Sequence, residues 1–220
     1  MKLEPVTPIK EVPISKIKED LNRYERLAAE LGATHVKILG TNEIILDYRV
    51  RYKCMVPKCR YYNTNANCPP HAPSLESTKK FIACFSDAIL TGLKVPSTSV
   101  LKSTGDRNHS GTDEKTSARR RLSRIVSAIE SEAYYDGYYF ATAFTSGHCK
   151  GTLCVDLPCQ ALENGKGCRH PLESRPSMEG VGMDVFQMVS NAGWPIYPVG
   201  RRCQAEDIPF GMLVGIILIC

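Results

Sequence analysis

The feature that most constrains this chain is a cysteine spacing that occurs twice. Three cysteines separated by gaps of four and eight residues stand at Cys54, Cys59 and Cys68. The same gaps recur one hundred residues later, and each trio is followed by a Pro-Ser-apolar-Glu segment. This second trio is Cys154, Cys159 and Cys168, with Cys149 one further gap of four ahead of it. Thiolates at regular gaps are typical of loops that close around an inorganic centre, so the fold has to bring each set together.

The chemistry expected of the ten cysteines depends on the cellular compartment of the protein. The first residues, MKLEPVTPIKEVP, contain no apolar core of a secretory signal, so we expect a cytoplasmic protein. Thiols stay reduced there, which favours metal binding or redox chemistry over disulfides or unliganded thiols. Structural zinc often uses cysteine pairs two residues apart, and the sequence has none. Gaps of four allow a loop to surround something wider than one ion, so we predict an iron–sulfur cluster, with zinc as the alternative.

The two loops differ in how many ligands they supply. The second loop has the four thiolates that a [4Fe–4S] cluster requires, at Cys149, Cys154, Cys159 and Cys168. The first loop has three thiolates, and the spacing does not identify a fourth ligand. The possibilities are a remote cysteine, a crossover of Cys149, His71, or an iron with a free position, the remote cysteines being Cys84, Cys203 and Cys220. The first three possibilities predict an electron carrier, and the last predicts an enzyme acting on a small anion.

The apolar pattern predicts a mixed α/β fold. Helices are expected over residues 14–31, 75–90 and 118–137, the second capped by Ser74, with a further helix capped by Ser177. Strands are expected over residues 35–39, 43–50, 138–144, 195–199 and 211–220, the last too short to span a bilayer. Residues 1–94 and 118–220 therefore form two pseudo-repeated strand, cysteine-loop and helix halves joined by a mobile linker, 95–117. We expect them to pack as one ferredoxin-like or related mixed-sheet domain over residues 1–220.

Three segments carry a resemblance to a known family. They are CRYYNTNANCPPHAPSLES, AFTSGHCKGTLCVDLPC and CRHPLESRPSMEGVGMDVFQMVSNAGWPI. Together they resemble an uncharacterised family of predicted metal-binding proteins, over roughly residues 10–220. The resemblance implies a cysteine-bound metal of iron–sulfur type and a distribution weighted toward anaerobes, with no assigned reaction. His148 stands here where the family more often has proline.

Cationic residues near the cysteines are candidate contacts of the cofactor. Arg169 and Arg175 are expected to neutralise an anionic cluster and to pair with Glu173 or Glu179, or else to bind a small anion. His71 is a further candidate, because it follows Cys68 by three residues.

Other functional classes lack support. No phosphate-binding loop, dinucleotide fingerprint or hydrolase motif occurs. The net charge of +5 does not require nucleic acid, and no aromatic residues alternate with the arginines of RRRLSR. The sequence therefore predicts an iron–sulfur protein that passes electrons to a redox partner protein in an anaerobic pathway.

Overall fold

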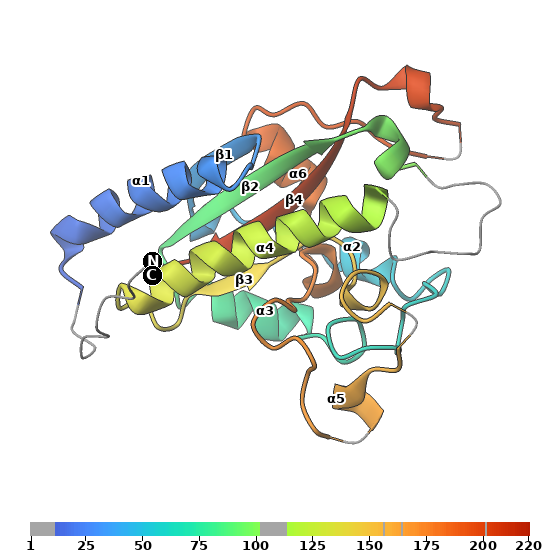
Figure 1. Ribbon diagram of the computed structural model, residues 1–220, viewed down its shortest axis with the longest axis horizontal. Helices are drawn as coiled ribbons and strands as arrows, with labels where there is room; N and C mark the ends of the chain where they lie inside the picture. Colours follow the sequence, from blue (N-terminus) through green and yellow to red (C-terminus); the bar gives the residue numbers. More distant parts are fainter. Residues whose placement is uncertain (1–11, 102–113, 156, 164, 201) are drawn as a thin grey trace.

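A four-stranded antiparallel sheet forms the centre of the computed structural model (Figure 1). The structure describes residues 12–101, 114–155, 157–163, 165–200 and 202–220. The strands are β1 (His35–Gly40), β2 (Asp87–Val95), β3 (Thr142–Phe144) and β4 (Gly211–Leu218), in the order β1-β2-β4-β3. β2 and β4 are central, and Ala88 pairs with Leu218 at one end of their register. The mixed α/β class is confirmed. A ferredoxin-like pseudo-repeat is not seen in the described residues.

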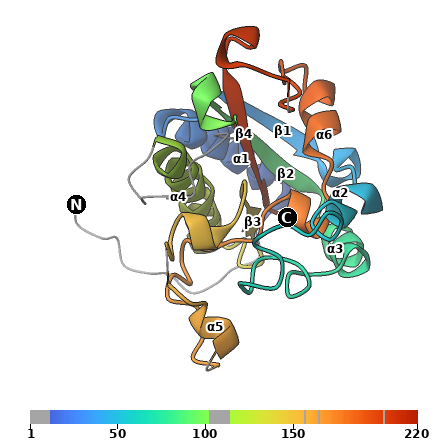
Figure 2. The ribbon, with the colours of Figure 1, turned by 90° about the vertical axis from the view of Figure 1, so that its right-hand side faces the viewer.

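Helices cover both faces of this sheet (Figure 2). On one face lie α1 (Ile14–Glu30) and α4 (Glu114–Tyr135), and on the other lie α3 (Leu75–Ile82) and α6 (Val185–Asn191). The alternation of side chains along β2 makes this possible, since Ile89 and Leu93 join the first layer and Ala88 and Leu90 join the second. Shorter helices are α2 (Tyr48–Tyr52) and α5 (Gln160–Glu163). The 3-10 turns are Thr41–Glu43, Ser97–Ser99, Cys149–Gly151, Glu179–Val181 and Ala205–Asp207.

Local signals located three helices. α1 ends as predicted before Gly32, whose φ of +98° lies in the left-handed region that glycine tolerates. α4 is followed by Gly137, with φ of +108°. The Ser74 hydroxyl accepts a hydrogen bond from the backbone N–H of Ser77 at 3.1 Å, so the predicted cap of α3 is confirmed.

The helix predicted over residues 75–90 was wrong in its second half. α3 ends at Ile82, and residues 87–95 form β2. Nearly all of β2 is buried, because it pairs with a strand on each side and carries a helical layer on each face. A strand in this position has a continuous apolar run, which periodicity alone does not separate from a helix.

The strand predicted over residues 43–50 was also wrong. The Asp47 carboxylate accepts the Arg49 N–H at 2.7 Å, and this cap starts α2 at Tyr48. Only an isolated bridge between Leu46 and Met183 remains of the expected strand.

Four further expectations were corrected in whole or in part. Of the strand expected over residues 138–144, only Thr142–Phe144 is a strand, and residues 195–199 form none. The Ser177 hydroxyl accepts the N–H of Gly180 in the short 3-10 turn Glu179–Val181, whereas Asp184 caps α6. In the predicted linker, residues 102–113 lie outside the described residues, while Val95 belongs to β2 and α4 begins at Glu114.

In the described residues, no helix is both long and apolar enough to cross a membrane.

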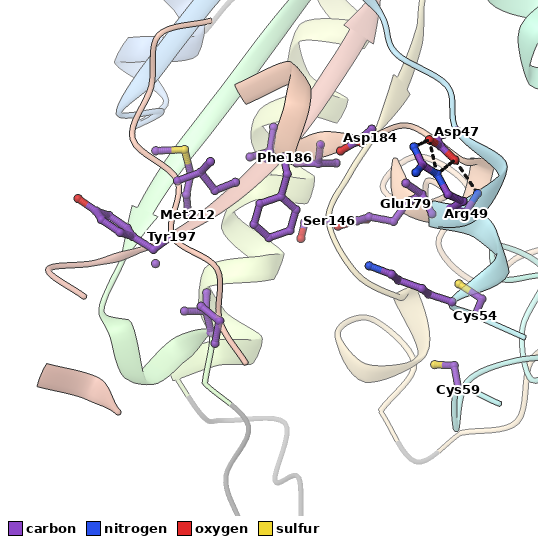
Figure 3. A pocket seen from close by; sticks show the side chains of 18 of the residues that line it. Asp47, Arg49, Cys54, Cys59, Ser146, Glu179, Asp184, Phe186, Tyr197 and Met212 are labelled. Atoms are coloured by element: carbon purple, nitrogen blue, oxygen red, sulfur yellow. Dashed lines mark hydrogen bonds and ion pairs between the residues drawn. The ribbon is translucent and has the colours of Figure 1, made fainter. Parts of the chain in front are cut away.

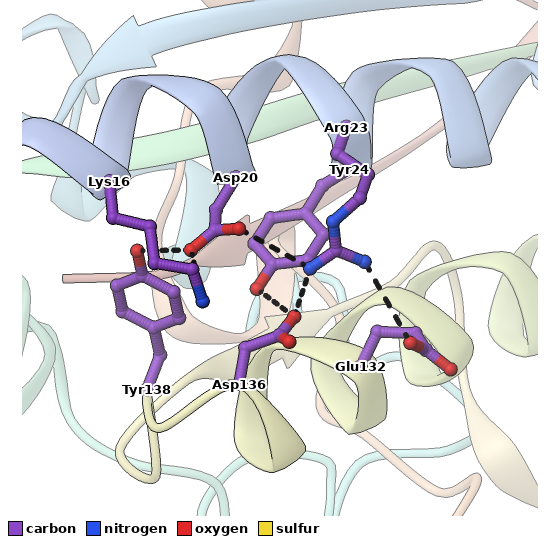
Figure 4. A network of polar contacts seen from close by, with 7 residues as sticks. All are labelled: Lys16, Asp20, Arg23, Tyr24, Glu132, Asp136 and Tyr138. Atoms are coloured by element: carbon purple, nitrogen blue, oxygen red, sulfur yellow. Dashed lines mark hydrogen bonds and ion pairs between the residues drawn. The ribbon is translucent and has the colours of Figure 1, made fainter. Parts of the chain in front are cut away.

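A polar network ties α1 to the end of α4 (Figure 4). Tyr24 donates to the Asp136 carboxylate at 2.6 Å, and Arg23 forms an ion pair with the same carboxylate. Tyr138 donates to Asp20 at 3.0 Å. Both tyrosine rings lie in the apolar layer, so these bonds satisfy hydroxyl groups that would otherwise be buried without partners.

Candidate metal centre

The two cysteine loops meet beyond the sheet. One loop connects α2 to α3, and the other runs from β3 through α5 toward α6. Figures 1 and 2 both show the first loop beside the segment that carries α5. Side-chain contacts join them: Asn67 donates to the Ser174 hydroxyl at 2.6 Å, and the Cys149 thiol donates to the Asn65 side-chain oxygen Oδ1 at 3.5 Å. Residues about a hundred positions apart are thus brought into one site.

The second loop gathers all four of its predicted ligands. They line one cavity of about 250 Å³, to which the first loop contributes Asn65 and Asn67, the four thiols being those of Cys149, Cys154, Cys159 and Cys168. This volume is far above the roughly 30 Å³ that a water molecule occupies in the liquid. Across the described residues, no three Cys, His, Asp or Glu side chains converge as ligands of a single ion. The space and the soft donor set fit a group larger than one ion.

Polar groups aim at these sulfur atoms. The His170 backbone N–H donates to the Cys168 sulfur at 3.4 Å. Burial raises the pKa of the Cys154 thiol, and a hydrogen bond from Arg169 opposes this shift. Burial likewise raises the pKa of Cys149, against hydrogen bonds to Ser174 and Asn67. Donors of this kind stabilise thiolates and tune a bound metal centre.

The first loop divides its cysteines between two surroundings. Cys54 and Cys59 line a larger cavity of about 800 Å³ (Figure 3), and the Cys59 N–H donates to the Cys54 carbonyl at 3.0 Å. Cys68 does not line that cavity. Burial raises the pKa of Cys68 to about 11, and the neighbouring thiols of Cys149, Cys54 and Cys59 add to the effect. Cys68 is therefore near Cys149 as well as near Cys54 and Cys59, so the crossover predicted as one possibility is compatible with the fold.

The other candidates for a fourth ligand make different contacts. Cys84 and Cys220 line a separate apolar cavity, and the Cys203 thiol contacts the carbonyl of Gln204. His71 places Nε2 at 2.7 Å from the Asn63 side-chain oxygen. No described contact links these side chains to the cysteine loops' thiols.

The two predicted arginines have different environments. Arg169 lines the smaller cavity, reaches Cys154, and also donates to the carbonyl of Pro158. Arg175 forms an ion pair with Glu130 of α4, with Nη2 2.5 Å from the carboxylate, and donates to the carbonyls of Pro171 and Ser174. Its acidic partner is therefore Glu130 and not the expected Glu173 or Glu179. The ion pair anchors the end of the second loop to α4.

One residue shapes the site without having been singled out in the sequence. Arg51 is buried and donates to the carbonyls of Ala72, Pro73 and Gly180. It therefore ties α2 to the end of the first cysteine loop and to the turn at Gly180. Its charge also lowers the pKa of Cys54, which burial raises. In the sequence, Arg51 stands three residues ahead of Cys54, and nothing there distinguishes it from the chain's many other cationic residues.

His148 has a positioning role. Its Nδ1 accepts the Gly151 N–H at 2.9 Å, capping the turn that begins at Cys149. Its ring stacks on Tyr61 of the first loop, with centroids 3.3 Å apart. The His148 side chain thus joins the two loops. A proline at this position would contribute only the packing of its ring and its fixed φ.

The family comparison agrees with this site. Residues 37–219 match the model of a family described as predicted metal-binding protein (DUF2284). The chain belongs to this family. The matched range contains both cysteine loops, so the metal binding predicted for the family and the gathering of thiols concern the same part of the molecule. No match was found among curated proteins or among solved structures.

Proposed function

We propose that this family member is an iron–sulfur protein with a [4Fe–4S]-type cluster bound by Cys149, Cys154, Cys159 and Cys168. The observation that carries the proposal is the cavity of about 250 Å³ that these four thiols line. Thiolates are the ligands such clusters use, and a cavity of this size suits a group wider than one ion.

The proposed activity is electron transfer. When bound, a cluster of this type accepts one electron and releases it to a partner. The protein's part is to supply thiolates, to stabilise their charge through Arg169 and the His170 N–H, and to limit access of water by closing the first loop over the site. We propose a redox partner protein, a cytoplasmic location and an anaerobic pathway, because reduced thiols and oxygen-sensitive clusters need such surroundings.

The test is metal analysis of protein purified without oxygen, comparing Cys159→Ser with Cys84→Ser. Cys84 is exposed and lines neither loop cavity, so it is the matched control. We expect iron and sulfide in equal amounts, visible absorbance that bleaches on reduction, and loss of this centre in Cys159→Ser alone. Equimolar zinc without sulfide would instead establish a structural zinc module.

The larger cavity favours a second candidate function. Cys54 and Cys59 line it, and a centre bound by three cysteines of the first loop has room beside it for a small molecule. In this alternative the first loop holds a cluster with one open iron, and the protein is an enzyme. Substrates would then perturb the spectrum of that centre and leave the second one unchanged.

A further inference from the structure

The cavity beside the first loop has two unlike ends (Figure 3). Phe186, Tyr197 and Met212 lie on one side, and Glu179, Cys54 and Cys59 lie on the other. Valines, an isoleucine and Phe210 also line the cavity. Its volume of about 800 Å³ falls within the range of roughly 300–1,000 Å³ that is typical of small-molecule sites.

Charged side chains of both signs line this cavity: the carboxylates of Asp47, Glu179 and Asp184, and the cations Arg49 and Lys53. Asp47 and Arg49 bond to each other, with Arg49 Nε 2.9 Å from the carboxylate. The Asp184 carboxylate caps α6 by accepting the Gln187 N–H at 3.1 Å. Lys53 also lines the cavity, and among the described residues it has no ion-pair partner. Ser146 adds a hydroxyl group between the two ends.

We propose that this cavity binds an organic carboxylate with an apolar body, its carboxylate at Lys53 and Ser146 and its body against Phe186 and Met212. A carboxylate accepts charge-assisted hydrogen bonds from an ammonium group and a hydroxyl. The apolar wall gains by removing a hydrocarbon or aromatic body from water. The inference deepens the second candidate function by naming its ligand class, although binding itself does not require a cluster.

Calorimetric titration of the anaerobically purified full chain tests the proposal with three probes. They are 4-phenylbutyrate, the neutral 4-phenylbutanamide, and butyrate, which lacks the aromatic body. We expect 4-phenylbutyrate to bind at least about tenfold more tightly than either of the others, as charge-assisted hydrogen bonds and aromatic burial each predict. Equal affinity for the acid and the amide, or no binding of any probe, would overturn the proposal.

Variants locate the site. Lys53→Met is expected to abolish the preference for acid over amide, and Phe186→Ala to weaken both phenyl probes by about tenfold with the preference retained. Phe186 is an exposed side chain, so its truncation leaves the core intact. Lys80→Met, an exposed lysine of α3 outside the cavity, is the control and should change nothing. Binding that neither Lys53→Met nor Phe186→Ala weakens would place the ligand elsewhere and reject the inference.

Iron and sulfide are measured in each sample, so that the two proposals fail separately. Probe binding by protein without iron would reject the cluster and keep the ligand site. A protein with full iron and sulfide but no probe binding would reject the ligand site alone.

Discussion

At the scale of single residues, burial controls the protonation of side chains that hold α1 to α4. Tyr24 is fully buried, and its pKa is raised by burial and by its hydrogen bond to Asp136. The pKa of Tyr138 is raised for the same reasons, with Asp20 as the partner. Both hydroxyl groups donate to carboxylates, so the folded state favours their protonated forms.

The fold should therefore lose stability in alkali. A tyrosine in the unfolded chain ionises near pH 10, while these two keep their protons to higher pH in the folded state. Their contribution is complete below about pH 10 and is lost as the pH rises toward the folded pKa values. We expect the unfolding temperature to fall as the pH rises above about 10. Thermal unfolding monitored by circular dichroism measures it.

Tyr24→Phe provides the comparison. It should lower the free energy of unfolding by about 1 kcal/mol at neutral pH, because one hydrogen bond is lost and Asp136 keeps Arg23. It should also flatten the alkaline decline. A decline as steep as in the parent protein would show that Tyr24 does not contribute to it.

At the scale of elements, α4 supports the second cysteine loop. Glu130 on this helix accepts the Ala143 N–H at 2.9 Å and pairs with Arg175. Both side chains of the ion pair are largely buried, at 18% and 12% exposure for Arg175 and Glu130. One carboxylate thus holds β3 and the loop end in place together.

We expect Arg175→Ala to lower the free energy of unfolding by about 3 kcal/mol, because it leaves the Glu130 carboxylate buried without its cation. It should also lower the metal content of the protein. Arg175→Lys, which retains the charge, should lose less. Urea unfolding followed by circular dichroism gives the free energy.

The control for this experiment is Lys80→Ala. Its ion pair with Glu76 is exposed at both ends, so we expect a change below about 0.5 kcal/mol. A similar small change for Arg175→Ala would contradict the anchoring role of Glu130.

At the scale of the whole molecule, the core and the candidate metal centre are separate. The two apolar layers pack on the sheet, while the seven loop cysteines are outside both clusters. We therefore expect a sheet that folds by apolar burial and loops that depend on bound metal.

Removal of the metal by a chelator should lower the unfolding temperature by roughly 10 °C. A ligand present at a concentration far above its dissociation constant adds about 4 kcal/mol to the free energy of unfolding, and this energy corresponds to such a shift for a protein of this size. Hydrogen exchange should rise in residues 54–72 and 149–175 and stay slow in β2 and β4. Equal loss of protection in β2 would show that the metal also holds the core together.

The sequence by itself determined the features that depend on neighbours a few residues away. The C-terminal ends of α1 and α4 follow from apolar periodicity and a glycine, and the strand β4 follows from its apolar run. The Ser74 cap follows from a hydroxyl group close to the backbone N–H whose hydrogen bond it accepts. The cysteine spacing also predicted a loop whose thiols gather, and the second loop's four line one cavity. That these thiols bind a metal, and which metal it is, stays a prediction.

Only the tertiary structure decided the features that depend on distant partners. β2 is a strand because β1 and β4 pair with it, although its residues continue a helical apolar pattern. Arg175 pairs with Glu130, and Cys68 lies near Cys149, across separations that no local spacing encodes. The physical reason is that burial and long-range pairing act on the folded chain as a whole, and they override local preference wherever the two disagree.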